Sequence, residues 1–132
     1  MIAGYVADLT AILRILADDQ EDGRIRAALE TVADDGHTLL LPITALIQAG
    51  IIADPHPEQL MWLYGFRATQ VSALSEQDAF RVMAQARFAP RPDEASVHHT
   101  HTAYLALMRG WPILTADVGS WKGYDHLELV QV

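Results

Sequence analysis

Short apolar runs alternate with longer helical segments along the whole chain, and this alternation constrains the fold more than any other feature. Each short run predicts a buried strand, and strands that alternate with helices are typical of a parallel sheet covered on both faces. We therefore predict an α/β protein with a mostly parallel, five-stranded sheet and helices on both faces. The predicted strands cover residues 1–8, 38–43, 71–74, 112–115 and 127–132.

Capping residues and apolar stripes predict the helices between these strands. Thr10 is expected to cap a helix that carries an apolar stripe to Leu16, and Gly36 is expected to close a helix over residues 24–35. Ser75 opens a capping box that predicts a helix to about Phe88. Further helices are expected over residues 44–52, 58–68 and 93–109, and a glycine-bearing loop over 119–126.

The composition narrows the class of protein. A length of 132 residues fits one domain over residues 1–132, and 51% hydrophobic residues are incompatible with a disordered chain. The absence of cysteine excludes a disulfide framework, a thiol nucleophile and a cysteine-built zinc site. No apolar run reaches about 18 residues and the start lacks a basic segment, so neither a membrane span nor a signal peptide is expected. We expect a cytoplasmic protein without a membrane partner.

The charge limits the partners. Nine lysines and arginines face seventeen acids, for a net charge of −8. Such a chain repels nucleic acid at long range, so tight nonspecific binding is disfavoured. Weak or brief contact with RNA, made through a metal ion, remains compatible with this charge.

Three polar residues follow predicted strands at the edge where open parallel sheets bind their ligands. Asp8 ends the first strand, Gln48 lies one helical turn beyond the second, and Asp117 ends the fourth. Two acids at neighbouring strand ends repel each other, so a cation between them is one use. The alternative is that each acid caps a helix or a turn.

Three of the six histidines lie close together, at His98, His99 and His101. On a helix, His98 and His101 share a face, whereas His99 points about 100° away from His98. A metal site would use one or two of them with a carboxylate. The alternative is a set of surface or interface histidines near the start of a helix.

The segment from Leu60 to Phe66 is apolar on all sides and carries no charge. Such a helix is either sandwiched in the core or exposed for a partner, in which case a homodimer surface is the expectation. Trp111 and Trp121 flank Asp117 and are expected to pack. The sequence has no glycine-rich phosphate loop and no supported serine triad.

Taken together, three segments resemble the PIN domain, the small metal-dependent ribonuclease fold of toxins of the VapC kind. They are Tyr5–Thr10, where an acid is followed two residues later by a threonine, Leu40–Gln48, and Thr102–Asp117. The last segment is the most specific. The resemblance spans essentially the whole chain and implies a three-layer PIN-like fold.

The resemblance also implies a site of four acids. The first falls on Asp8 and the fourth on Asp117, but the second falls on Gln48 and the third on His99. Thr10 and Thr115 would hold these ligands, or waters bound between them. Mg²⁺ prefers carboxylate oxygens, so the loss of two charges weakens its binding and relatively favours a softer ion such as Mn²⁺ or Zn²⁺. A protonated His99 between Asp8 and Asp117 could replace the cation altogether.

Three functions follow from this resemblance. The first is a degenerate PIN-domain protein related to toxin–antitoxin endoribonucleases, with metal-dependent RNA cleavage weakened or lost. The second is an active endoribonuclease toxin that uses Mg²⁺ or Mn²⁺ and is restrained by an antitoxin protein. The third is a non-catalytic, protein-binding scaffold without a cofactor.

A homodimer is expected because members of the family often form pairs. An unrelated class, a small α/β ligand-binding domain, also remains open, although the missing glycine-rich loop argues against a nucleotide.

Overall fold

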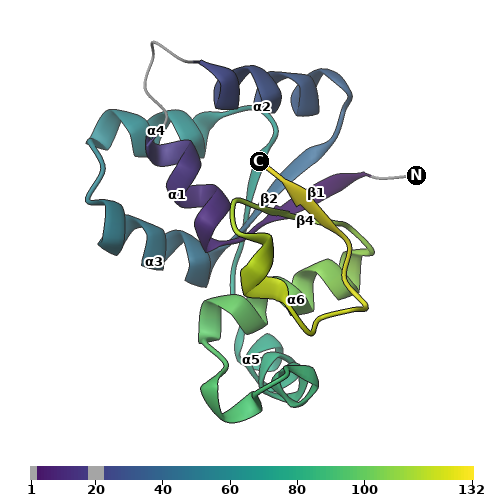
Figure 1. Ribbon diagram of the computed structural model, residues 1–132. Helices are drawn as coiled ribbons and strands as arrows, with labels where there is room; N and C mark the ends of the chain where they lie inside the picture. Colours follow the sequence, from purple (N-terminus) through teal and green to yellow (C-terminus); the bar gives the residue numbers. More distant parts are fainter. Residues whose placement is uncertain (1–2, 18–22) are drawn as a thin grey trace.

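The computed structural model describes residues 3–17 and 23–132, and its sheet confirms the predicted fold class (Figure 1). Five strands pair in parallel throughout, in the order β3-β2-β1-β4-β5. The predicted strand over 71–74 was placed too late, because pairing with β2 extends β3 back to Thr69. The strands are β1 (Gly4–Ala7), β2 (Thr38–Pro42), β3 (Thr69–Ser72), β4 (Ile113–Thr115) and β5 (Leu129–Gln131).

Six α-helices and three short 3-10 helices connect the strands in the described part of the chain. The α-helices are α1 (Leu9–Ala17), α2 (Arg24–Asp34), α3 (Ile43–Ala53), α4 (Pro57–Gly65), α5 (Glu76–Gln85) and α6 (Val97–Arg109). The 3-10 helices are η1 (Ala86–Phe88), η2 (Pro92–Glu94) and η3 (Val118–Trp121).

Two predicted helix starts were wrong. The helix expected from residue 93 begins at Val97, because the Ser96 side chain accepts a hydrogen bond from the backbone N–H of His99 and so caps α6. Thr10 lies inside α1 and does not cap it; the cap is Asp8, whose carboxylate accepts from the backbone N–H of Ala11.

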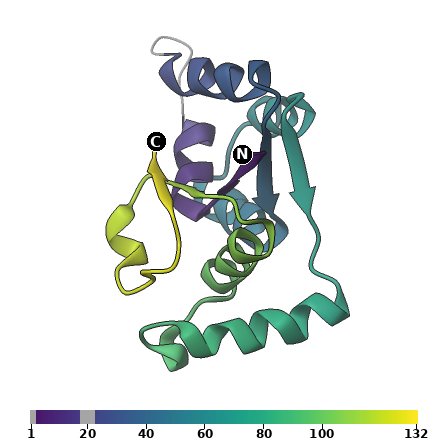
Figure 2. The ribbon, with the colours of Figure 1, turned by 90° about the vertical axis from the view of Figure 1, so that its right-hand side faces the viewer.

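The sheet separates two apolar cores, which gives three layers. Side chains alternate between the two faces along each strand. Ala7 and Leu41 face a core shared with α1, α2, α3 and α4. Val6, Leu40 and Ile113 face the other core, which α6 and the η3 segment cover. Figure 2 shows α5 below α6, farther from the sheet, and α5 packs mainly on α6.

The strand order creates a switch point between β1 and β4. The chain builds β2 and β3 on one side of β1 and then crosses to build β4 and β5 on the other. The segments that follow β1 and β4 therefore lead to opposite faces of the sheet, α1 to one core and η3 to the other. Open α/β sheets bind their ligands at the carboxyl ends of the strands beside such a switch point. Asp8 directly follows β1 and Asp117 lies two residues beyond β4, so both predicted acids are at this edge.

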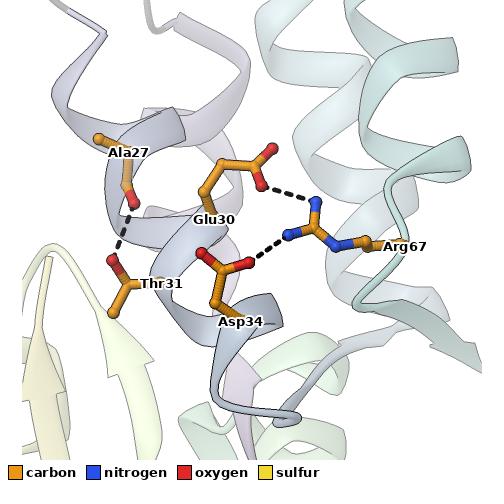
Figure 3. A network of polar contacts seen from close by, with 5 residues as sticks. All are labelled: Ala27, Glu30, Thr31, Asp34 and Arg67. Carbon is orange, nitrogen blue, oxygen red and sulfur yellow. Dashed lines mark hydrogen bonds and ion pairs between the residues drawn. The ribbon is translucent and has the colours of Figure 1, made fainter.

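At the opposite edge of the sheet, Arg67, in the segment that precedes β3, binds two acids of α2 (Figure 3). Its guanidinium donates to Glu30 at 2.6 Å and to Asp34 at 2.7 Å, two acids one helical turn apart on α2. These groups are exposed, so screening by water leaves them a role in orientation more than in stability.

His101 is a core residue of α6 rather than a surface histidine. It is fully buried, and its Nδ1 lies 2.8 Å from the hydroxyl of Thr44 on α3. Its Nε2 has no hydrogen-bond partner among the described residues. Burial lowers the pKa of His101, and the charge of Asp78 opposes this only in part.

This burial predicts acid-sensitive stability. Because the pKa of folded His101 lies below its usual 6.5, the unfolded chain takes up more protons than the folded one as the pH falls through that value. The free energy of unfolding should therefore decrease between about pH 7.5 and about pH 5.5, by at most about 1.4 kcal/mol per pH unit for each such histidine. Urea unfolding at both pH values measures this change. His101→Gln should flatten the dependence, and a slope equal to wild type would contradict the assignment.

Candidate functional site

Both oxygens of the Asp8 carboxylate accept hydrogen bonds from other groups of the protein. Its Oδ1 accepts from the Thr10 hydroxyl at 2.7 Å and from the Ala11 backbone N–H at 2.8 Å. Its Oδ2 accepts from the Trp121 indole N–H at 2.8 Å. Asp8 is only 3% exposed. The capping alternative is thus confirmed for Asp8, and the carboxylate is also bound by a residue from beyond β4.

Two threonines fasten the ends of β1 and β4 together. The hydroxyls of Thr10 and Thr115 lie 3.1 Å apart. The Thr10 hydroxyl also accepts from the backbone N–H of Ala116 at 2.9 Å, and the Thr115 hydroxyl accepts from that of Asp117 at 3.1 Å. The structure therefore brings Thr10 and Thr115 to the site as expected, and it uses them to hold the loop backbone.

Asp117 itself is exposed at the start of η3. Its backbone carbonyl accepts a hydrogen bond from the Ser120 hydroxyl at 2.7 Å, which shapes the short turn that leads to Trp121. The two acids at the sheet edge therefore differ: Asp8 is buried and bonded by protein groups, whereas Asp117 faces water.

His99 stacks on the indole that binds Asp8. The ring centroids of His99 and Trp121 are 3.6 Å apart and the planes differ by 17°. Tyr124 meets both rings edge-on, with centroids 5.4 Å from His99 and 5.1 Å from Trp121. His98 lies beside His99, with ring centroids 6.3 Å apart.

Burial disfavours the protonated form of His98 and of His99. Burial lowers the pKa of His98 and of His99, and the nearby charge of Asp8 offsets this effect only in part. The protonated His99 between the two acids stays a prediction, and no hydrogen bond among the described residues joins the His99 ring to Asp8. The donor to Asp8 is the Trp121 indole, and His99 covers the face of that indole.

Gln48 and the histidines do not complete a ring of ligands around Asp8. Gln48 is half-buried on α3, a helix that packs against α1 and α6, and no hydrogen bond between the described residues joins it to Asp8. Within residues 3–17 and 23–132, no three His, Asp or Glu side chains are grouped so that they could hold a metal ion. Mg²⁺ takes oxygen ligands in octahedral geometry, and the donor set around Asp8 does not fit it.

Trp121 is the site residue that the sequence did not reveal. It was expected to pack, and it does so at 2% exposure, but its N–H also meets a carboxylate 113 residues away in the chain. No motif spacing encodes such a pair. The only hint was its place four residues beyond Asp117.

The comparisons with known proteins add no relative. A scan against protein-family models and a search of curated proteins both gave no match for this chain. Among the described residues, none of the helices has the length and apolar character needed to cross a membrane. The resemblance to PIN domains accordingly stays a prediction.

Replacing Trp121 by phenylalanine tests whether its indole N–H is needed. Trp121→Phe leaves one oxygen of a buried carboxylate without its charge-assisted donor, so the free energy of unfolding should fall by at least about 1.5 kcal/mol. Urea unfolding at neutral pH measures the change. Tyr124→Phe is the matched control, because it removes a hydroxyl from the same aromatic cluster but no hydrogen bond to Asp8. Equal, small effects of both variants would contradict the assigned bond.

Proposed function

We propose that this chain is a degenerate PIN-domain protein, related to toxin–antitoxin endoribonucleases, whose metal-dependent cleavage of RNA is weakened or lost. Support for the ancestry comes from the three similar segments, the all-parallel sheet and the two acids beside its switch point. Support for the loss of chemistry comes from the atoms around Asp8.

The binding of Trp121 to Asp8 is the observation that carries the proposal. A metal ligand needs a lone pair directed at an open position. Oδ1 of Asp8 accepts two protein donors and Oδ2 accepts the indole N–H, inside a cluster that is nearly closed to water. A divalent cation would have to displace the indole and lose most of its own water, which is costly for Mg²⁺.

The other two acid positions provide no compensating charge. Gln48 offers a neutral amide, and His99 offers a ring that is stacked on Trp121 and whose pKa is lowered by burial. Asp8 and Asp117 leave two formal negative charges where the family arrangement has four. Attraction between the site and a divalent cation is correspondingly weaker.

Restoring the two missing acids tests the proposal. The double variant Gln48→Glu/His99→Asp supplies the carboxylates and removes the ring that covers Trp121. We expect the wild-type protein not to cleave RNA with either Mg²⁺ or Mn²⁺. The double variant should bind Mn²⁺ at least about tenfold more tightly than wild type does. Calorimetry measures the binding, and a single-stranded RNA pool measures the cleavage.

Asp8→Asn, alone and added to the double variant, is the control for both measurements. Cleavage by wild type that Asp8→Asn abolishes would show an active enzyme and refute the loss of chemistry. A folded double variant that binds Mn²⁺ no better than wild type would instead refute the PIN-domain ancestry of the site.

An exposed apolar face supports self-association as a further part of the proposal. The predicted apolar segment from Leu60 to Phe66 is divided between core and surface: Leu63 and Phe66 are buried, whereas Met61 and Tyr64 are exposed. The helix α3 also exposes apolar side chains, at Ile47, Ile51 and Ile52. A groove of about 420 Å³, lined by Leu46 of α3, Leu41 of β2 and residues of α4, has no charged lining residue.

We propose a second copy of the chain as the occupant of this face. The net charge of −8 opposes association, but an uncharged contact face brings no like charges together. Light scattering should show a dimer for wild type, a monomer for Ile51→Gln, and a dimer for the control Leu107→Gln, which alters an exposed residue of α6. A monomeric wild type would contradict self-association and leave the face to an antitoxin protein.

A further inference from the structure

An open hollow of about 670 Å³ lies beside the Asp8 cluster, between the segment that precedes α6 and the segment that follows η3. This volume is in the range of small-molecule binding sites. Its polar lining consists of two cations, one carboxylate, two serine hydroxyls and two aromatic rings: Arg91, Lys122, Glu94, Ser96, Ser120, His99 and Tyr124.

The two cations make this hollow unusual in an acidic protein. The chain has nine basic residues against seventeen acids, and several of the arginines are engaged elsewhere. Arg67 binds two acids, and Arg26 and Arg109 lie over tryptophan rings. Lys122 has no ion pair within the described part of the chain, and Arg91 has a long, exposed one of 3.4 Å to Glu94. The lining favours an anion.

The remaining groups fit a phosphate joined to a planar ring. The Ser96 oxygen accepts from the His99 N–H, which leaves its own hydrogen to donate to a ligand. The thirteen-residue helix α6 begins at this wall, and its N-terminal end adds partial positive charge. The rings of His99 and Tyr124 also line the hollow, with centroids 5.4 Å apart and planes inclined by 69°. Trp121 covers one face of His99 and Tyr124 is only 8% exposed, so a planar group would contact the remaining exposed part of these rings.

We propose that this hollow binds a small phosphorylated compound with an aromatic base, of the nucleoside monophosphate class. Arg91, Lys122 and the Ser96 hydroxyl would hold the phosphate, and His99 and Tyr124 would contact the base. The donors come from side chains and not from a glycine-rich loop, so a search for phosphate-loop motifs does not find the site. Binding here requires neither a metal nor cleavage at Asp8.

Glu94 provides a sensitive test, because it is the acid on the rim of the hollow. Its carboxylate lies 3.4 Å from the Arg91 guanidinium, so it competes with an incoming phosphate for this cation. Glu94→Gln removes this competitor together with a like charge. The substitution should therefore tighten binding, whereas loss of either cation should weaken it.

Calorimetry with adenosine monophosphate measures the binding, with inorganic phosphate and adenosine as the two component ligands. We expect the monophosphate to bind more tightly than either component. Arg91→Gln and Lys122→Gln should each weaken it about tenfold or more, and Glu94→Gln should strengthen it severalfold. Arg109→Gln is the matched control: it makes the same charge change about 18 Å away along α6 and should leave the affinity unchanged.

Four results would overturn the proposal. They are absence of binding by wild type, an equal loss in the Arg109→Gln control, inorganic phosphate binding as tightly as the monophosphate, and binding of single-stranded RNA without the monophosphate. All of the substituted residues are exposed, so unchanged circular dichroism should show that the variants remain folded.

Discussion

A carboxylate that is almost completely buried must be supplied with donors, and the local structure around Asp8 supplies them from three directions. The first turn of α1 provides a backbone N–H, Thr10 provides a hydroxyl, and η3 provides the Trp121 indole. Removing any of these donors would leave part of the buried negative charge without a hydrogen bond, which destabilises the folded protein. The path of the chain after β4, which brings Trp121 back over β1, is thus tied to this one side chain.

The same bond explains why the sheet edge differs from a metal centre. The strand order places Asp8 and Asp117 at the carboxyl ends of neighbouring strands. A cation bound between two such carboxylates would reduce their repulsion. Here Asp8 is bonded by protein groups and Asp117 is exposed to water, so the two charges are stabilised separately. His99 reinforces this arrangement because it stacks on the indole, and its burial lowers the pKa of its ring.

Local features of the sequence predicted much of the fold and part of the site. Apolar runs that end in a polar residue located β1 and β4 with their acids, because burial and strand ends are encoded within a few residues. The β3 boundary was missed because pairing with β2 recruits Thr69 and Gln70, which carry no apolar signal. The Trp121–Asp8 bond and the Thr44–His101 contact join residues 113 and 57 positions apart, and only the folded chain shows such pairs.

The central claim is that the Trp121 indole occupies the position at Asp8 that a metal would need. The most direct measurement follows the indole N–H signals of the ¹⁵N-labelled protein by nuclear magnetic resonance during titration with paramagnetic Mn²⁺. Trp62, Trp111 and Trp121 give three signals, so two serve as internal references. The claim predicts that the Trp121 signal broadens no more than the other two. Selective loss of the Trp121 signal at stoichiometric Mn²⁺ would place a metal beside Asp8 and contradict it.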